Sequence, residues 1–204
     1  MDKRWKQLGD ILINYSTDVK PGERVMIAMT EPETFPLVQG VCEAAIKAGA
    51  YPQVQFLSET LRHSFLKYGN RDQLSWVPEI EAYGMEWADV YIGLRGAHNL
   101  FEHADIPAEA LSLNQCAMGK VSTMRWQKTR WCLVRVPNSA FAQQAETNLE
   151  TITEMFFNAC LLDWETKSKE WQRMADDLAS SGEVHIVGKG TDLSFSVKGR
   201  KWLA

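Results

Sequence analysis

A short segment at residues 25–29 constrains the fold of this chain more than any other part of the sequence. All of its residues are apolar, without the alternation of apolar and polar side chains that marks a strand with one face in water. A strand of this kind is typical of a parallel sheet that helices cover on both faces. The turn residues Pro21 and Gly22 precede it. The segment therefore predicts an α/β protein built around a buried sheet.

Helical periodicity lies on both sides of this strand. Apolar residues recur at three- and four-residue spacing over residues 5–15 and again over residues 35–46, and Gly49 follows where a left-handed residue usually ends a helix. Further strands are expected at residues 54–57, 89–94 and 131–136. Helical segments are expected at residues 58–83, with interruptions near Gly69 and at Pro78, and at residues 108–120. This β-α-β-α-β order predicts right-handed crossovers and a doubly wound, mostly parallel sheet flanked by helices.

The pattern changes near the end of the chain. Residues 140–178 carry a long helical signal, which predicts either two helices or one bent helix. An apolar run at residues 184–187 is followed by alternating apolar and polar residues at 193–197, which predicts an antiparallel hairpin. We therefore expect an N-terminal α/β domain over residues 1–180. Residues 181–204 would be the first strands of a truncated C-terminal catalytic domain.

The charge balance argues against one class of partner. The chain has 22 basic and 26 acidic residues, mixed along its length, and a formal net charge of -4. Nucleic-acid binding needs a positively charged surface against the phosphates, so no nucleic-acid partner is expected. The first residues lack the apolar core of a signal peptide, and no run of about 18 apolar residues could span a bilayer. The sequence thus predicts a cytoplasmic protein without a membrane partner.

Cysteine and tryptophan residues give hints about the interior and the surface. The cysteines, at positions 42, 116, 132 and 160, form no Cys-x-x-Cys pair, and we expect them to be reduced core residues. The chain also has 8 tryptophans, and large aromatic residues are enriched in cores and interfaces. Some of these tryptophans are therefore expected to pack against a missing domain or a second subunit.

The turn after the strand at residues 25–29 is the first candidate for a ligand site. In a doubly wound sheet, the N-terminus of the helix after the first strand is a site where phosphate groups bind. Here the turn contains Glu31 and Glu33 and lacks glycine. Its carboxylates would repel a pyrophosphate, so a dinucleotide site is not expected. The alternative is that Thr30 or Glu31 caps the helix that follows.

His98 and His103, with Glu102 between them, are the candidates for metal ligands. Five residues on a helix correspond to a rotation of about 500°, which leaves the two rings about 140° apart, unlike the pair in a His-Glu-x-x-His helix. The two histidines could bind one metal only from an irregular loop. The interpretation that we favour is two loop histidines that face solvent.

Arg95 follows the third predicted strand, at the sheet edge where ligands bind in open α/β proteins. It could hold an anion there or form a salt bridge with a neighbour, and we favour the salt bridge. No nucleophile is indicated, because the chain has no Gly-x-Ser-x-Gly motif and no cysteine beside an evident base. The residues alone therefore assign no catalytic, cofactor-binding or metal-binding residue.

Three segments resemble the thermophilic aminopeptidase family, the M29 metallopeptidases, which include enzymes like aminopeptidase T and aminopeptidase S. Residues 14–25 resemble the opening of the family. Residues 130–137, together with residues 141–145, resemble its middle. The most specific segment is residues 190–200, Gly-Thr-Asp-Leu-Ser-Phe-Ser-Val-Lys-Gly-Arg. The segments occur in the order of the family, and the resemblance spans nearly the whole chain.

This resemblance implies a two-domain, dimeric exopeptidase that removes N-terminal residues from peptides with two divalent metal ions, zinc or cobalt. In the family the metal ligands are glutamates, histidines and an aspartate of the second domain, beyond the motif at residues 190–200. No position of this chain matches them, so no ligand is carried over. We therefore expect the non-catalytic N-terminal part of a metalloaminopeptidase, inactive by itself, whose parent enzyme forms a homodimer.

Two other interpretations stay open. Ring-cleaving iron dioxygenases and aromatic deaminases resemble this family in scaffold, so the parent could catalyse a different reaction. The chain could also be a standalone binding or interaction module. The ligands supplied by the rest of the gene would distinguish these possibilities.

Overall fold

The computed structural model describes residues 2–203. Contacts within the chain divide it into two compact units, one ending at Leu161 and the other beginning at Leu162. The first unit contains the predicted parallel sheet and its helices, and the second contains one long helix and a hairpin. The domain boundary expected after residue 180 stays a prediction.

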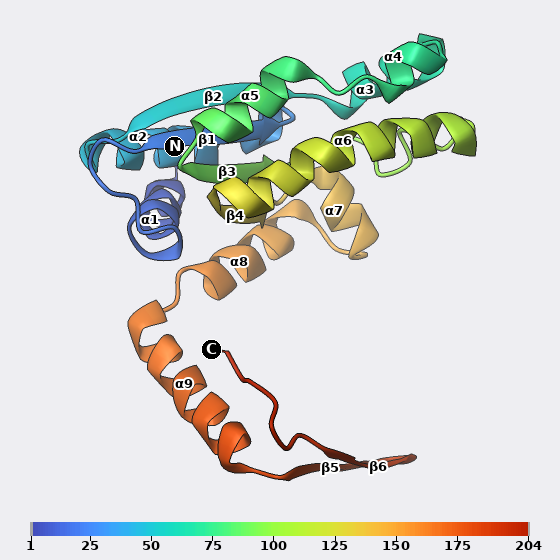
Figure 1. The fold of residues 1–204 in the computed structure, drawn as a ribbon. Helices are drawn as coiled ribbons and strands as arrows, with labels where there is room; N and C mark the ends of the chain where they lie inside the picture. Colours follow the sequence, from blue (N-terminus) through green and yellow to red (C-terminus); the bar gives the residue numbers. More distant parts are fainter. Residues whose placement is uncertain (1, 204) are drawn as a thin grey trace. The chain divides into compact units, whose positions relative to one another are not determined.

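The first unit is built on a four-stranded parallel sheet with the order β2-β1-β3-β4 (Figure 1). Its strands are β1 (Arg24–Thr30), β2 (Tyr51–Leu57), β3 (Val90–Arg95) and β4 (Arg130–Arg135). In the register of the central strands, Ile27 of β1 is opposite Val54 of β2 and Ile92 of β3. All four predicted strands are present, and the predicted α/β fold with a parallel sheet is confirmed.

Within residues 2–161, eight α-helices precede, connect or follow the strands. They are α1 (Lys3–Ile11), α2 (Phe35–Lys47), α3 (Glu59–Tyr68), α4 (Arg71–Ser75), α5 (Glu79–Trp87), α6 (Ala108–Lys128), α7 (Ser139–Gln144) and α8 (Leu149–Cys160). A π-helical turn at Leu12–Ser16 continues α1, and a 3-10 turn at Pro32–Thr34 precedes α2. The helical segment expected at residues 58–83 is thus three helices, which are separated near Gly69 and Pro78.

The central strands bury both of their faces, which explains why the segment at residues 25–29 is continuously apolar. Val25 and Ile27 belong to a core that also contains residues of α1 and α2. Met26 and Ala28 point to the opposite face, into a core with residues of α5 and α6. Successive side chains of a strand point to opposite faces, so helices on both sides require apolar residues at every position.

Helices α1 and α2 pack with their backbones in close contact. A Cβ atom added to Gly9 would lie 2.4 Å from the carbonyl carbon of Gly40. A Cβ atom added to Gly40 would lie 2.5 Å from the carbonyl oxygen of Trp5. Two glycines at the crossing point therefore allow the helices to approach more closely than any larger residue would permit.

Helix α6 extends beyond its predicted end at residue 120. The helix passes through Gly119, where an added Cβ atom would meet no other atom within 4 Å. Ala117, Val121 and Arg125 are buried at a spacing of four residues. This packing against the sheet outweighs the low helix propensity of one glycine, which costs about 1 kcal/mol.

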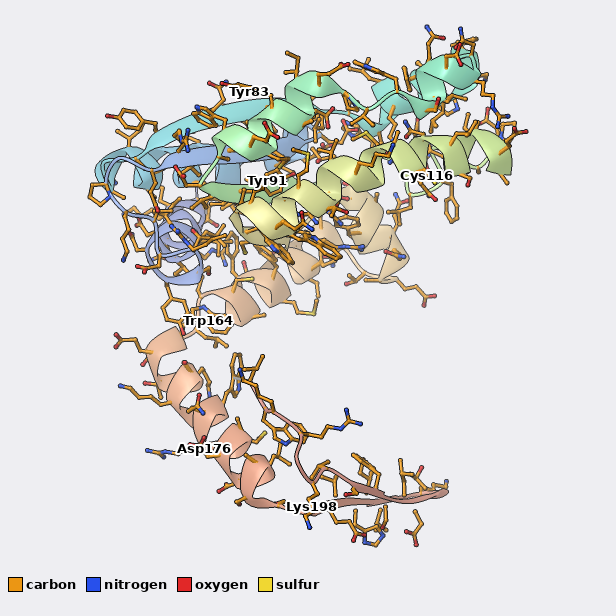
Figure 2. The ribbon with its side chains drawn as sticks, viewed as in Figure 1. Tyr83, Tyr91, Cys116, Trp164, Asp176 and Lys198 are labelled. Carbon is orange, nitrogen blue, oxygen red and sulfur yellow. The ribbon has the colours of Figure 1, made fainter. Side chains whose placement is uncertain are left out.

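Within residues 2–203, the four cysteines form no disulfide. Cys42, Cys132 and Cys160 are partly buried beside the core of α1 and α2. Cys116 is exposed on α6 (Figure 2), so its assignment to the core is wrong. The reason is that Cys116 lies on the outer side of α6, whereas the neighbouring Ala117 is buried on its inward side.

The second unit contains α9 (Trp164–Ser180) and the antiparallel strands β5 (Glu183–Gly188) and β6 (Thr191–Ser196). Gly188 is opposite Thr191, and Gly190 between them has a φ of 73°, which a glycine adopts without strain. The predicted hairpin is therefore confirmed. Within residues 2–203, no helix is both long and apolar enough to cross a membrane.

Candidate functional site

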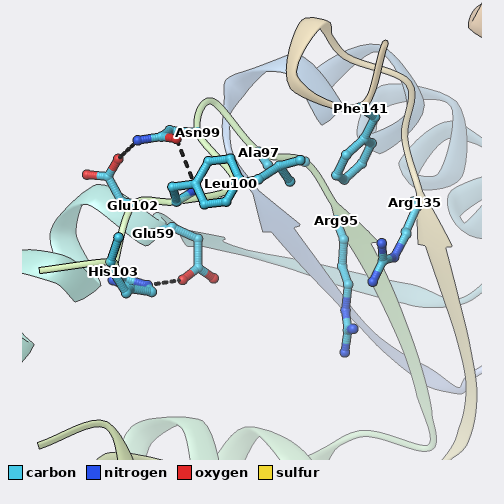
Figure 3. A pocket seen from close by; sticks show the side chains of 12 residues that line it. Glu59, Arg95, Ala97, Asn99, Leu100, Glu102, His103, Arg135 and Phe141 are labelled. Atoms are coloured by element: carbon cyan, nitrogen blue, oxygen red, sulfur yellow. Dashed lines mark hydrogen bonds and ion pairs between the residues drawn. The ribbon is translucent and has the colours of Figure 1, made fainter. Parts of the chain in front are cut away.

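The carboxyl edge of the parallel sheet carries the candidate site. A cavity of about 360 Å³ lies there, bordered by the ends of β3 and β4, by the loop at residues 96–104, and by Glu59 of α3 and Phe141 of α7 (Figure 3). Ligands of open α/β proteins bind outside the carboxyl ends of the strands, where loops from several strands meet. The cavity is therefore in the position that the fold favours for a ligand.

Glu31 connects two of these strand ends. Its side chain is 2% exposed, and its backbone has a φ of 67°, which is uncommon for a residue with a side chain. Oε1 accepts hydrogen bonds from the backbone N–H of Glu59 at 2.6 Å and from the hydroxyl of Ser58 at 3.2 Å. The carboxylate thus caps the N-terminus of α3, where a negative charge is favourable.

The cap is on a different helix from the one that the sequence suggested. Thr30 or Glu31 was expected to cap the helix after β1, but no side chain caps the 3-10 turn or α2. Strand β2 lies beside β1 in the sheet, and α3 starts directly after β2. The N-terminus of α3 therefore lies next to the end of β1, within reach of Glu31.

His98 and His103 contact different carboxylates. Nε2 of His98 is 3.4 Å from Oε2 of Glu31, and its Nδ1 is 2.5 Å from Oε1 of Glu33. Nε2 of His103 is 2.8 Å from Oε2 of Glu59. The side chain of His103 is only 21% exposed, so the expectation that it faces solvent is wrong. The reason is that the loop at residues 96–104 folds back onto α3.

These acids and histidines do not fit a metal site. The two nitrogens of His98 point to two different carboxylates, so Glu31 and Glu33 do not converge on one point with the ring. A bound transition metal needs at least three protein ligands around one position. Among residues 2–203, no three side chains of histidine, cysteine, aspartate or glutamate are grouped so that they could hold a metal ion. We therefore derive no metal-dependent step from this site.

Arg95 and Arg135 lie side by side at the ends of β3 and β4 (Figure 3). Within the described residues, neither guanidinium has a carboxylate within 4.0 Å, so the salt bridge favoured for Arg95 is not formed. The guanidinium of Arg135 lies over the ring of Phe141 at 5.8 Å. The cavity therefore has two positive charges on one wall.

The backbone around these arginines is well fixed. The N–H of Val136 donates to the carbonyl of Arg95 at 2.9 Å, which joins the two strand ends. The buried Asn138 caps α7 by accepting a hydrogen bond from the N–H of Phe141 at 3.0 Å. No site role was predicted from the sequence for Arg135 or Asn138. The Pro137-Asn138 pair directly after a strand was the available signal for a strand end and a helix cap.

A second group of buried polar residues lies between α6 and the sheet. The guanidinium of Arg125 is close to the rings of Tyr91, at 5.5 Å, and Trp131, at 5.2 Å. Burial raises the pKa of the Tyr91 hydroxyl and the pKa of the Glu81 carboxyl. The side chain of Tyr91 points toward α6 in Figure 2, away from the core of α1 and α2. None of these residues lines the cavity at the carboxyl edge of the sheet, and we assign the group a structural role.

Comparison with known proteins identifies a family and a similar fold. The family model described as thermophilic metalloprotease (M29) matches residues 1–204. AmpT from Thermus thermophilus is similar with a TM-score of 0.77 and 17% sequence identity, over 95% of this chain and 53% of that one. The chain therefore spans about half of the AmpT structure. No curated protein matches it.

Two other solved structures are similar only in part. A putative LacI-family transcription repressor from Corynebacterium glutamicum has a TM-score of 0.36 and 10% identity, over 78% of this chain and 54% of that one. The CurK enoyl reductase has a TM-score of 0.29 and 12% identity, over 83% of this chain and 49% of that one. These scores are too low to support an argument about fold or function.

Proposed function

Because this chain belongs to the thermophilic metalloprotease family (M29), we propose that it is the non-catalytic α/β part of a metal-dependent aminopeptidase that removes N-terminal residues from peptides. The observation that carries this proposal is the match of the family model to residues 1–204. The likeness to AmpT supports the assignment of the fold and covers about half of that protein.

In this proposal the metal ligands belong to residues outside the 204 of this chain. Two divalent ions, zinc or cobalt, would supply the activated water and polarise the scissile carbonyl. The α/β unit would support the catalytic part and form one wall of the substrate entrance. Residues 1–180 then form the N-terminal domain, and the hairpin at residues 181–204 begins the catalytic one.

A homodimer is also part of this proposal. Trp126 and Trp131 are both exposed, and their rings stack with centroids 6.5 Å apart. Aromatic residues are enriched in subunit contacts, and β4 is an edge strand of the sheet. The pair is a candidate for the contact between subunits. Sizing of the parent protein and of a Trp126→Ser/Trp131→Ser double variant checks this, since a dimeric variant would exclude the pair from the contact.

The activity test compares two proteins made from the same gene. The parent protein, with added zinc or cobalt, is expected to release an N-terminal amino acid from a chromogenic amide and to lose this activity in chelator. The 204-residue chain is expected to release none under the same conditions. Metal-dependent release by the purified 204-residue chain, free of contaminating protease, would overturn the non-catalytic assignment. A parent protein that releases no N-terminal amino acid, but cleaves or deaminates an aromatic compound, would overturn the peptidase assignment.

A further inference from the structure

The pair of arginines in the cavity would be stabilised by a compensating negative charge. Arg95 and Arg135 are the last residues of neighbouring parallel strands, and they are register partners. Adjacent strands lie about 4.8 Å apart, and directly opposed side chains point to the same face of a sheet. Two guanidinium groups are therefore held close together, where their like charges repel each other.

No acid of the described chain provides this charge. Glu59 and Glu102 border the same cavity but make other contacts. Glu59 contacts His103 at 2.8 Å, and Glu102 accepts a hydrogen bond from Asn99 at 3.2 Å. Figure 3 shows these residues on the side of the cavity opposite the two arginines. The arginine wall is thus left open to a negatively charged group from outside.

The surroundings of the arginines indicate what kind of anion fits. The ring centroid of Phe141 lies 5.8 Å from Cζ of Arg135, a cation–π distance that leaves the guanidinium N–H groups available to donate to a ligand. The guanidinium group matches a carboxylate with two parallel hydrogen bonds. Leu100, Phe101 and Ala97 add apolar surface to the cavity. A ligand with one carboxylate and an apolar body fits both features.

We propose that Arg95 and Arg135 form a binding site for the carboxylate of a small, partly apolar molecule. Carboxylate binding is inferred from the cavity itself. The further identification of this molecule as a short peptide, held by its C-terminal carboxylate, rests on the proposed function. Phosphate is also an anion, but the apolar lining of the cavity favours an organic acid over a free phosphate ion.

The test uses two probes of similar shape, of which only one carries a negative charge. N-acetyl-phenylalanine has a free carboxylate, an apolar ring and no free amino group, so an aminopeptidase does not cleave it. N-acetyl-phenylalanine amide lacks the charge. Calorimetric titration of the protein is expected to show saturable binding of the acid at millimolar concentrations or below, and at least about tenfold weaker binding of the amide. Binding of the acid should weaken as salt is added.

Three variants locate the site. Arg95→Gln and Arg135→Gln remove the charge and keep a polar side chain, and each is expected to weaken binding of the acid by about tenfold or more. Arg173→Gln removes the same charge from α9, outside the cavity lining, and should leave binding unchanged. The melting temperature of each variant verifies folding. The comparison of acid and amide on the unaltered protein decides the proposal even if a variant is unstable.

Several results would overturn the proposal. Equal binding of the acid and the amide would remove the role of the carboxylate. Binding that survives both arginine substitutions would place the site elsewhere. Saturable binding of inorganic phosphate without binding of the acid would make this a phosphate site. These titrations involve no turnover, so they test carboxylate binding separately from peptidase activity. Carboxylate binding can be confirmed when the parent protein is not a peptidase, and it can be absent when the parent is an active peptidase.

Discussion

Glu31 and Glu59 are joined by a hydrogen bond of 2.6 Å between the buried carboxylate of the first and the backbone N–H of the second. This bond connects the end of β1 to the start of α3 across the carboxyl edge of the sheet. Glu59 in turn contacts His103 of the loop that borders the cavity. One buried acid thus helps to position two elements around the candidate site.

Removal of this acid should destabilise the fold. In Glu31→Ala, the N–H of Glu59 and the hydroxyl of Ser58 lose their acceptor, so we expect the free energy of unfolding to fall by about 1–3 kcal/mol. Urea denaturation measures the difference. Glu33→Ala is the matched control, because that carboxylate is about one third exposed and pairs with His98. Its effect should stay below about 1 kcal/mol, and equal losses in the two variants would contradict the role given to Glu31.

Gly9 in α1 and Gly119 in α6 are expected to respond in opposite ways to substitution by alanine. Gly9→Ala places a methyl group against the backbone of Gly40, and we expect a loss of about 1–3 kcal/mol or more, because the two helices must separate. Gly119→Ala has open space in the middle of α6 and should stabilise the protein by about 0.5–1 kcal/mol. A melting temperature of Gly9→Ala that is unchanged or raised would show that the crossing of α1 and α2 is looser than described. A lowered melting temperature of Gly119→Ala would contradict the open space at that position.

The contact between Arg24 and Asp89 predicts a pH dependence of stability. Side-chain and backbone hydrogen bonds from Arg24 lower the pKa of Asp89 below its ordinary value of 3.8. A lowered pKa in the folded state contributes stability above that ordinary value, which is lost as the pH falls through the folded pKa. The contribution should be below about 1 kcal/mol, because the two side chains are 43% and 35% exposed and solvent screens them.

Asp89→Asn tests this contribution. We expect the variant to be less stable than the unaltered protein at neutral pH and the difference to shrink at pH values below 3.8. Urea denaturation at each pH gives the free energies. Asp10→Asn, at an exposed position of α1 that makes no ion pair within residues 2–203, should have no such pH-dependent effect. A difference that persists unchanged at low pH would mean that the charge of Asp89 is not its source.

The cysteines should differ in reactivity. Burial raises the pKa of the thiols of Cys42, Cys132 and Cys160, so little thiolate is present to react at mildly alkaline pH. Cys116 is exposed, and we expect one rapidly reacting thiol with an aromatic disulfide reagent. Cys116→Ser should abolish the rapid phase. A rapid phase that remains in this variant would indicate that one of the buried thiols becomes accessible in solution.

Local patterns in the sequence determined most of the fold. The apolar run at residues 25–29 predicted a strand buried on both faces, and Ile27 and Met26 do lie in cores on opposite sides of the sheet. The alternation at residues 193–197 predicted the hairpin of β5 and β6. These signals succeed because burial on one or both faces of a strand, and on one side of a helix, imposes a period on neighbouring residues.

Only the tertiary structure decided which distant residues meet. Glu31 caps α3 because β2 lies beside β1, and Arg95 meets Arg135 because β4 lies beside β3 in register. Sheet order and register depend on contacts between segments far apart in the chain, and no local pattern specifies them. The sequence by itself therefore determined the elements and their faces. The tertiary structure decided the cap, the histidine–carboxylate contacts and the arginine pair, because these depend on distances across the sheet edge.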